Sequence, residues 1–357
     1  MLDIEWLIEV SKKVINDGCL ENGAIVAANA TKYYFPARAK NYFYVWPRDA
    51  SFVCLAADMV NISGIQERFF AWCMDRAEDF DQTGLLYEKY YVNGPKSLCR
   101  FQPDQTATLL VAIWHHYNMD LTKAERFENL IIKAADGLCN VWKTDHFDII
   151  TNDLWEECLT FPDLNENFTY TLASCIKGLE CANEMISNPK WLLTANQMRM
   201  RLNDHFIAGY FVKSYGKLID KRIDASVLGL VYPFGIYKAD DEYMISTVRE
   251  MERKIVIKGG VHRYELDQYD GWVYEKMPRN KGAGAWPLLN FWMSIYYLFN
   301  GDRNKAKKYY NWVLNNLRSE DGYMPEQIFD NCLQISVSPL LWSHAMFIIA
   351  SKFLNYV

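Results

Sequence analysis

The segment Thr83-Gly84-Leu85-Leu86-Tyr87-Glu88-Lys89 resembles a second segment far along the chain, Asp321-Gly322-Tyr323-Met324-Pro325-Glu326-Gln327. In both, a glycine precedes two apolar residues and a Glu falls four positions after that glycine. A weaker echo runs from Phe147-Asp148 to Trp155-Glu156. Recurrence of one loop pattern is typical of a repeated supersecondary unit. The alternative, that Gly-apolar-apolar is simply a favoured hairpin loop, remains open at this point.

The loops separate segments in which apolar residues recur at steps of three and four, which predicts helices. Residues 210–213 alternate like a short strand, and little else does. Twelve helices without a linker rich in Pro, Gly or Ser predict an all-α fold, a closed (α/α)6 barrel of six helical hairpins. We expect one catalytic domain over residues 1–357 and no separate β-sandwich. The expected helices are 2–17, 48–61, 64–79, 104–118, 121–143, 166–187, 190–207, 224–231, 240–256, 284–299, 303–317 and 338–355.

Composition excludes several classes of function. The 357 residues are 50% hydrophobic and 15% aromatic with a net charge of -6, so no basic field favours nucleic acid. No apolar run of about 18 residues predicts a membrane span. The first twelve residues place acids before any positive charge, unlike a secretory signal. The nine cysteines are scattered singly, which favours free thiols in a reducing cytoplasm, and the six histidines lack the spacing of a metal site.

Two glutamates stand out because of their surroundings. Glu156 lies in Asp153-Leu154-Trp155-Glu156-Glu157, and Glu326 follows Tyr323-Met324-Pro325. Contact with Trp155 would desolvate a carboxyl and raise its pKa, as a general acid requires. Two carboxyls that face each other across an aromatic pocket are the minimum for cleaving a glycosidic bond. The sequence therefore predicts a glycoside hydrolase.

Other acids also lie beside arginines and aromatic residues on loops before predicted helices. Arg48 and Asp49 follow Tyr42 and Trp46, and this combination can read vicinal hydroxyls while flat faces stack on the sugar. Asp49 could instead serve only the dipole of a helix N-terminus.

Three further segments share this composition. Asp104, in Arg100-Phe101-Gln102-Pro103-Asp104-Gln105, could bind a substrate or act only as an N-cap. The segment 263–270 holds Arg263, three acids and two tyrosines without a helical stripe. Trp342, in Pro339-Leu340-Leu341-Trp342-Ser343-His344-Ala345, could line the pocket or belong to an ordinary helix core.

These motifs resemble the inverting, glucoamylase-type glycoside hydrolases of family 15, from about Tyr42 to Ala345. The shared patterns are Tyr-x-x-x-Trp-x-Arg-Asp, Trp-Glu-Glu, Arg-Tyr-x-x-Asp-x-Tyr, and Glu-Gln followed by Trp-Ser-His-Ala. The resemblance implies an (α/α)6 barrel. It implies that Glu156 is the general acid, Glu326 the general base, and Glu157 a ligand of the glucose unit beyond the scissile bond.

The resemblance also implies substrate-binding roles for the remaining motif residues. Arg48, Asp49 and Arg263 would hold hydroxyls of the terminal glucose. The pocket walls would be Tyr42, Trp46, Trp155, Tyr269 and Trp342, with support from Asp267 and Gln327. Gln102 and Asp104 would help to shape the sites beyond the first sugar, where the family's usual glycine is replaced at Gln105 and Ala107. That departure leaves linkage and chain length open.

The implied reaction is exo-hydrolysis of an α-linked glucose oligosaccharide or polysaccharide, with release of β-glucose. An inverting enzyme needs about 6.5–9.5 Å between its carboxyls, and the chemistry needs no metal or cofactor. Alternatives are an α-glucosidase specific for a disaccharide such as trehalose or isomaltose, and a carbohydrate-binding protein without catalysis. A terpenoid cyclase is disfavoured because Asp240-Asp241-Glu242-Tyr243-Met244 lacks the last acid of the required cluster. The oligomeric state does not follow from the sequence.

Overall fold

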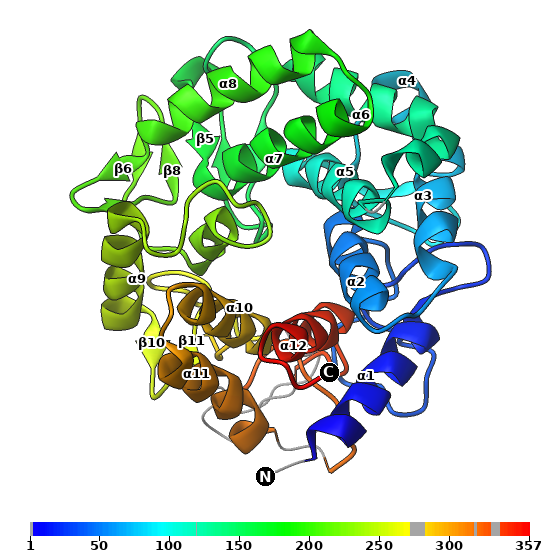
Figure 1. Cartoon of the computed structure of the whole chain (residues 1–357), viewed down its shortest axis with the longest axis vertical. Coiled ribbons are helices and arrows are strands. Elements are labelled where there is room, and N and C mark those ends of the chain that lie inside the picture. The colour runs from blue at the N-terminus through cyan, green and yellow to red at the C-terminus, as the bar shows by residue number, and fades with distance from the viewer. Residues whose placement is uncertain (1–2, 119, 272–282, 318–319, 330–335) are drawn as a thin grey trace.

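The computed structural model describes residues 3–118, 120–271, 283–317, 320–329 and 336–357. Its helices form two concentric rings (Figure 1). Successive inner helices contact one another, and the last of them closes the ring against the first. The inner helices are α2 (Pro47–Met59), α5 (Pro103–His116), α7 (Thr169–Met185), the 3-10 helix η3 (Ala225–Leu230), α10 (Pro287–Phe299) and α12 (Leu341–Phe353). The outer helices are α1 (Ile4–Gly18), α3 (Ile65–Asp75), α6 (Glu128–Val141), α8 (Pro189–Asn203), α9 (Glu242–Lys254) and α11 (Arg303–Asn316).

The inner and outer helices differ in which of their residues are buried. In α10 every residue from Pro287 to Tyr297 is buried, as expected for a helix with protein on all sides. In the outer helix α9 the buried residues are Met244, Thr247, Val248 and Met251, at the spacing of a single apolar stripe. The sequence prediction of an (α/α)6 barrel is therefore confirmed.

The predicted helix boundaries need three corrections. The segment predicted as one helix over 121–143 begins as a 3-10 turn, η1 (Leu121–Phe127), and continues as α6. The segment 224–231 forms only the short helix η3. A four-residue helix, α4 (Phe80–Thr83), was not expected because it is shorter than the period that reveals a helix.

The connections between helices hold more short strands than the one that the sequence indicated at 210–213, where β7 does form. Short antiparallel pairs occupy the connections, and none of the described sheets has more than three strands. Their pairings are too brief to give a period-2 signal. The strands are β1 (Tyr87–Tyr90), β2 (Lys96–Phe101), β3 (Thr151–Asn152), β4 (Leu159–Thr160), β5 (Asn167–Phe168), β6 (Phe206–Ile207), β7 (Tyr210–Phe211), β8 (Ser214–Tyr215), β9 (Ile219–Asp220), β10 (Val256–Ile257) and β11 (Gly260–Val261); η2 spans Pro162–Leu164.

Three inner helices begin in the same way. Pro47, Pro103 and Pro287 each follow an extended N-cap residue and start α2, α5 and α10. Proline suits this position because its φ is helical and its missing N–H would have no partner. The loops that enter the inner helices place Trp46 and Trp286, the residues just before two of these prolines, in the wall of one cavity.

The loop repeat also has a structural counterpart. Gly84 and Gly322 both adopt left-handed backbone angles, with φ of 69° and 74°. A side chain at Gly84 would collide with the carbonyl oxygen of Lys133, so the turn requires glycine there. Four residues later, Glu88 and Glu326 both reach the same cavity. The two loops thus deliver carboxyls to one place by similar turns.

Candidate active site

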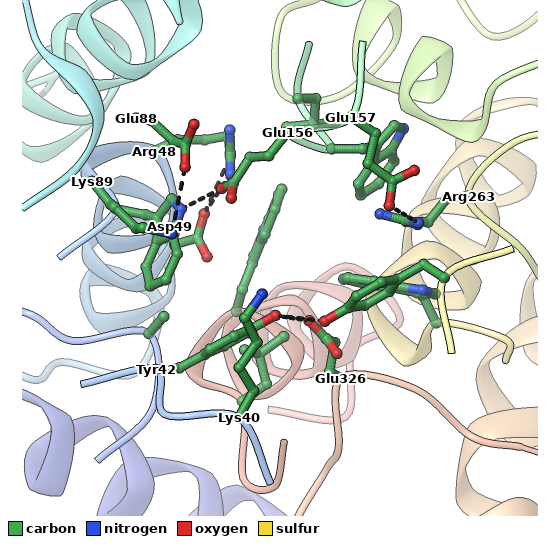
Figure 2. A pocket seen from close by; sticks show the side chains of 18 of the residues that line it. Lys40, Tyr42, Arg48, Asp49, Glu88, Lys89, Glu156, Glu157, Arg263 and Glu326 are labelled. Atoms are coloured by element: carbon green, nitrogen blue, oxygen red, sulfur yellow. Dashed lines mark hydrogen bonds and ion pairs between the residues drawn. The ribbon is translucent and has the colours of Figure 1, made fainter. Parts of the chain in front are cut away.

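A cavity of about 500 Å³ lies where the inner-helix entry loops meet. This volume falls within the range of roughly 300–1,000 Å³ typical of small-molecule sites. Figure 2 shows acids and bases projecting into it from several separate segments. The lining residues are Ala27, Lys40, Tyr42, Trp46, Arg48, Asp49, Glu88, Lys89, Leu98, Arg100, Leu154, Trp155, Glu156, Glu157, Arg263, Tyr269, Trp286, Glu326, Leu340 and Trp342.

Glu156 lies in the tight turn between β3 and β4. Its backbone is left-handed, with φ of 65°, which is uncommon for a residue other than glycine. Asp153 braces the turn: its carbonyl oxygen accepts the Glu156 N–H at 3.0 Å, and its Oδ1 accepts the N–H groups of Glu157 and Cys158 at 2.8 and 3.0 Å. The carboxyl of Glu156 is thereby aimed into the cavity (Figure 2).

The surroundings of Glu156 favour its protonated form. Burial raises its pKa, the negative charge of Glu88 raises it further, and the pKa reaches about 8. The indole N–H of Trp46 donates to Oε1 and opposes the shift. This carboxyl is therefore equipped to hold a proton at neutral pH and to donate it.

Glu326 lies across the cavity from Glu156 (Figure 2). Only 2% of the residue is exposed. Tyr42 donates its hydroxyl to Glu326 Oε1 at 2.8 Å, and the same hydroxyl lies 2.9 Å from that of Tyr269. Burial raises the Glu326 pKa, while the Tyr42 hydrogen bond and the charge of Arg263 oppose the rise. Oε2 is buried with no hydrogen-bond partner among the described residues, so it can accept a proton from a bound water.

The first turn of α12 fixes the loop that carries Glu326. His344 accepts the N–H of Met324 at Nε2, at 2.9 Å, and its Nδ1 lies 2.9 Å from the hydroxyl of Ser11. Burial lowers the His344 pKa to about 3, so the ring is neutral and Nε2 remains an acceptor. Ser343 donates to the carbonyl of Pro325 at 2.9 Å. The Ser-His pair of the sequence motif therefore anchors this loop rather than contacting the cavity.

Arg48 is held in the cavity wall by a buried ion-pair network. Its Nη2 lies 3.1 Å from Asp49 Oδ1, and its Nη1 lies 3.0 Å from Asp104 Oδ2. Burial raises the Asp49 pKa to about 6 although Arg48 opposes the rise. The guanidinium also lies 5.1 Å from the ring centre of Trp342. Arg48 and Asp49 can together offer donors and acceptors to sugar hydroxyls.

Arg263 is held in another part of the cavity wall by neighbouring acids, as Arg48 is. It binds Asp267 through two hydrogen bonds of 2.8 and 2.7 Å and donates to Glu157 at 2.8 Å. Its guanidinium lies 4.8 Å from the ring centre of Tyr269. Glu157 also accepts the hydroxyl of Tyr264. Glu157 is thus fixed beside Glu156 and can accept a hydrogen bond from a substrate hydroxyl.

The family model of glycosyl hydrolases family 15 matches residues 11–352, nearly the whole chain. The chain belongs to this family. An uncharacterized glycosyl hydrolase of Methanocaldococcus jannaschii is 34% identical over 93% of this chain, which spans 53% of that relative. The chain therefore spans about half the length of this relative. An isomaltose glucohydrolase of Kribbella flavida is 23% identical and matches 86% of this chain and 83% of that protein.

Solved structures of similar fold agree with the family. A glycosidase in complex with glucose matches over the full length of both chains, with a TM-score of 0.79 and 23% identity. The glucoamylase of Saccharomycopsis fibuligera matches with a TM-score of 0.72 and 16% identity, over 99% of this chain and 96% of that one. A bacterial glucoamylase complexed with acarbose has a TM-score of 0.71 and 18% identity, over 97% of this chain and 55% of that one. At these identities the likeness shows a shared six-hairpin fold.

The cavity of this family 15 member contains most of the residues that the sequence predicted for the site. Tyr42, Trp46, Arg48, Asp49, Trp155, Glu156, Glu157, Arg263, Tyr269, Glu326 and Trp342 all line it. For Asp49 and Trp342 the sequence left a structural alternative open beside the pocket role, and both descriptions apply in part. Asp49 does lie in the first turn of α2. Trp342 both lines the cavity and packs on Phe52, with ring centres 5.0 Å apart.

Four predicted substrate-binding residues lie behind the wall instead. Asp104 binds Arg48, and Gln102 accepts from Arg48 at 3.3 Å and donates to the Asp153 carbonyl at 2.6 Å. Asp104 is not an N-cap either, because α5 begins at Pro103. Asp267 binds Arg263 as described above. The side-chain oxygen of Gln327 accepts the N–H of Gly284 at 2.8 Å. Residues that line the cavity and residues that support them from behind lie next to each other in the same short motifs, so sequence spacing alone does not distinguish the two sets.

Sequence reasoning missed several wall residues. Glu88 was visible in the loop repeat, and Trp286 precedes Pro287 just as Trp46 precedes Pro47. Some other wall residues lie in segments that the sequence analysis singled out, namely Lys89, Arg100, Leu154 and Leu340, whereas Ala27, Lys40 and Leu98 have no comparable signal.

In the described part of the chain, no group of three or more His, Cys, Asp or Glu side chains is arranged to hold a metal ion. The described helices include none with the length and hydropathy needed to cross a bilayer.

Proposed function

We propose that this protein is an inverting, exo-acting α-glucosidase that releases β-glucose from the non-reducing end of an α-glucoside. The observation that carries the proposal is the pair of carboxyls, Glu156 and Glu326, on opposite walls of one aromatic-lined cavity. Their environments differ as an acid and a base require. A pKa of about 8 keeps the proton on Glu156. Burial raises the pKa of Glu326 as well, but Tyr42 and Arg263 oppose that rise and favour its ionised form.

In the proposed mechanism, Arg48 and Asp49 hold hydroxyls of the terminal glucose. Glu156 gives its proton to the glycosidic oxygen as the bond to the anomeric carbon stretches. Glu326 takes a proton from water, which attacks that carbon from the opposite face. Room for this water requires a carboxyl separation of about 6.5–9.5 Å. The product is glucose of the opposite anomeric configuration.

We further propose that the preferred substrates are short α-glucosides rather than long α-glucans. The β1–β2 hairpin brings Leu98 and Arg100 to the cavity wall, and Arg100 donates to the carbonyl oxygen of Glu156 at 3.2 Å. Arg100 is thereby tied to the turn that carries Glu156, the acid turn, and its side chain would narrow the space beyond the scissile bond. The isomaltose glucohydrolase among the relatives fits this specificity.

The test is glucose release from maltose, isomaltose, trehalose and soluble starch by the wild-type protein and by Glu156→Gln and Glu326→Gln. We expect hydrolysis of at least one disaccharide with higher kcat/KM than starch. Each variant should lose about 10²–10⁴-fold in kcat, the usual contribution of general acid–base catalysis. A carbohydrate-binding protein without catalysis would bind these sugars and release no glucose. Near-normal rates in either variant would refute the assigned roles.

A further inference from the structure

A buried ammonium group lies directly behind the turn that carries Glu156. Lys213 comes from the segment between β7 and β8, and its side chain is 2% exposed. Its backbone is fixed on both sides: its N–H donates to the carbonyl of Asp220 at 3.0 Å, and its own carbonyl accepts from Thr169 at 3.1 Å. The ammonium therefore occupies a defined place, although it does not line the large cavity.

Lys213 forms ion pairs with two buried aspartates. Nζ lies 2.7 Å from Asp153 Oδ2 and 2.9 Å from Asp224 Oδ2, and both aspartate side chains are at most 3% exposed. Burial alone would lower the Lys213 pKa, but the two carboxylates outweigh it and raise the pKa above its ordinary value. The lysine is charged, and it balances two negative charges that would otherwise be buried together.

Each partner of Lys213 places a different residue of the site. Asp153 accepts the N–H groups of Glu157 and Cys158 and so shapes the acid turn. Asp224 accepts the indole N–H of Trp155 at 3.0 and 3.1 Å, which fixes that ring in the cavity wall.

Lys213 makes one more contact with the site. Its ammonium lies 4.2 Å from the ring centre of Tyr264, which donates its hydroxyl to Glu157. One cation therefore contacts three side chains that bind Trp155 and Glu157, the residues on either side of Glu156.

We propose that Lys213 is a positioning residue that aims the Glu156 carboxyl at the leaving-group oxygen. This inference rests on the proposed function. Without the ammonium, the two aspartates repel each other and the turn relaxes. A misplacement of about 1 Å can cost a catalytic group about 10²-fold in rate. The loss should affect proton donation by Glu156 rather than activation of water by Glu326. Glu326 is held by Tyr42 and by the contacts of its own loop with α12, and Lys213 takes no part in these contacts.

This division of labour can be measured with two substrates. A disaccharide needs a proton on its leaving oxygen, whereas α-glucosyl fluoride loses fluoride without one. In both, water adds to the anomeric carbon and its proton goes to Glu326. We expect Lys213→Met to lower kcat by about 100-fold on the disaccharide, consistent with a displaced general acid. The loss on the fluoride should stay below about five-fold, because the acid contributes little to that reaction.

Lys254→Met is the matched control. Lys254 also lies between two carboxylates, 3.4 Å from Glu250 and 3.0 Å from Glu265, and 5.5 Å from a tyrosine ring centre, but it lies on the outer helix α9. It should leave both rates unchanged. If Lys213→Met does not fold, the double variant Lys213→Gln/Asp224→Asn, which removes one charge of each sign, gives the same comparison.

Equal losses on the two substrates, or no loss on the disaccharide, would overturn the positioning role. Wild-type protein that hydrolyses neither substrate would instead overturn the proposed function, so the two failures are distinguishable.

Discussion

The hydroxyl of Tyr42 should set the acid side of the pH profile. It donates to Glu326 Oε1 at 2.8 Å, and Tyr42 stays protonated because burial and the Glu326 charge raise its own pKa. A hydrogen bond to an ionised group contributes about 1.5–3 kcal/mol. Since about 1.4 kcal/mol is a tenfold change in an equilibrium constant, this bond favours the ionised form of Glu326 by about 10–100-fold, and it opposes the rise in the Glu326 pKa that burial causes.

The change to make is Tyr42→Phe. Removing the donor destabilises the carboxylate, so the Glu326 pKa rises and the pH below which activity falls moves upward by about 1–2 units. The alkaline limb, which belongs to Glu156 at about pH 8, should stay in place. The assay is kcat/KM on a disaccharide from pH 4 to 9.

Tyr44→Phe is the control. Tyr44 lies only two positions after Tyr42 in the sequence, and its ring packs on Trp46 and Tyr91. An acid limb that stays at its wild-type pH in Tyr42→Phe would refute the assignment of Glu326 as the base. A shift of the alkaline limb instead would mean that the acid and base are exchanged.

Three other substitutions test the structure around the site. Glu156→Gln should raise the free energy of unfolding relative to the wild type, and the difference should grow as pH rises from 4.5 to about 8. The reason is that the folded wild-type protein keeps the Glu156 proton up to a higher pH than the unfolded chain does, which destabilises it as pH rises. Urea denaturation should show a gain of at most about 5 kcal/mol. Asp104→Asn should cost about 3–5 kcal/mol of stability and raise KM, since it leaves Arg48 without one buried partner. His344→Leu should lower kcat with little change in KM for a disaccharide, because the N–H of Met324 loses its acceptor and the Glu326 loop loosens; an unchanged kcat would show that the loop does not depend on this contact.

The fold could be predicted because the starts of several inner helices are marked by motifs in the sequence. Motif residues such as Trp46, Arg48 and Trp342 stand at the starts of apolar helices, and a ring of helices brings those starts together. The six-residue helix η3 completes the ring as a 3-10 turn, although its sequence predicted a longer helix. Its first residues take their geometry from Asp224, whose carboxylate accepts the N–H of Ser226 at 2.8 Å.

The rest of the site could not be predicted, for a physical reason. Lys89 lies in the irregular strand β1, where no periodic pattern marks which side chain faces the cavity. Residues 210–213 do alternate, but that pattern does not reveal that Lys213 binds Asp153 and Asp224. Asp267 and Gln327 belong to recognisable motifs, but their side chains bind Arg263 and the N–H of Gly284 and do not line the cavity. A motif records which residues must be near one another, whereas only the packed structure tells which of them reach the cavity.

The central claim is that water attacks the face opposite the leaving group, with Glu156 as acid and Glu326 as base. Proton NMR of the glucose formed during the first seconds of turnover tests it most directly, before mutarotation mixes the anomers. The account predicts β-glucose as the first product of an α-glucoside. α-Glucose as the first product would contradict it.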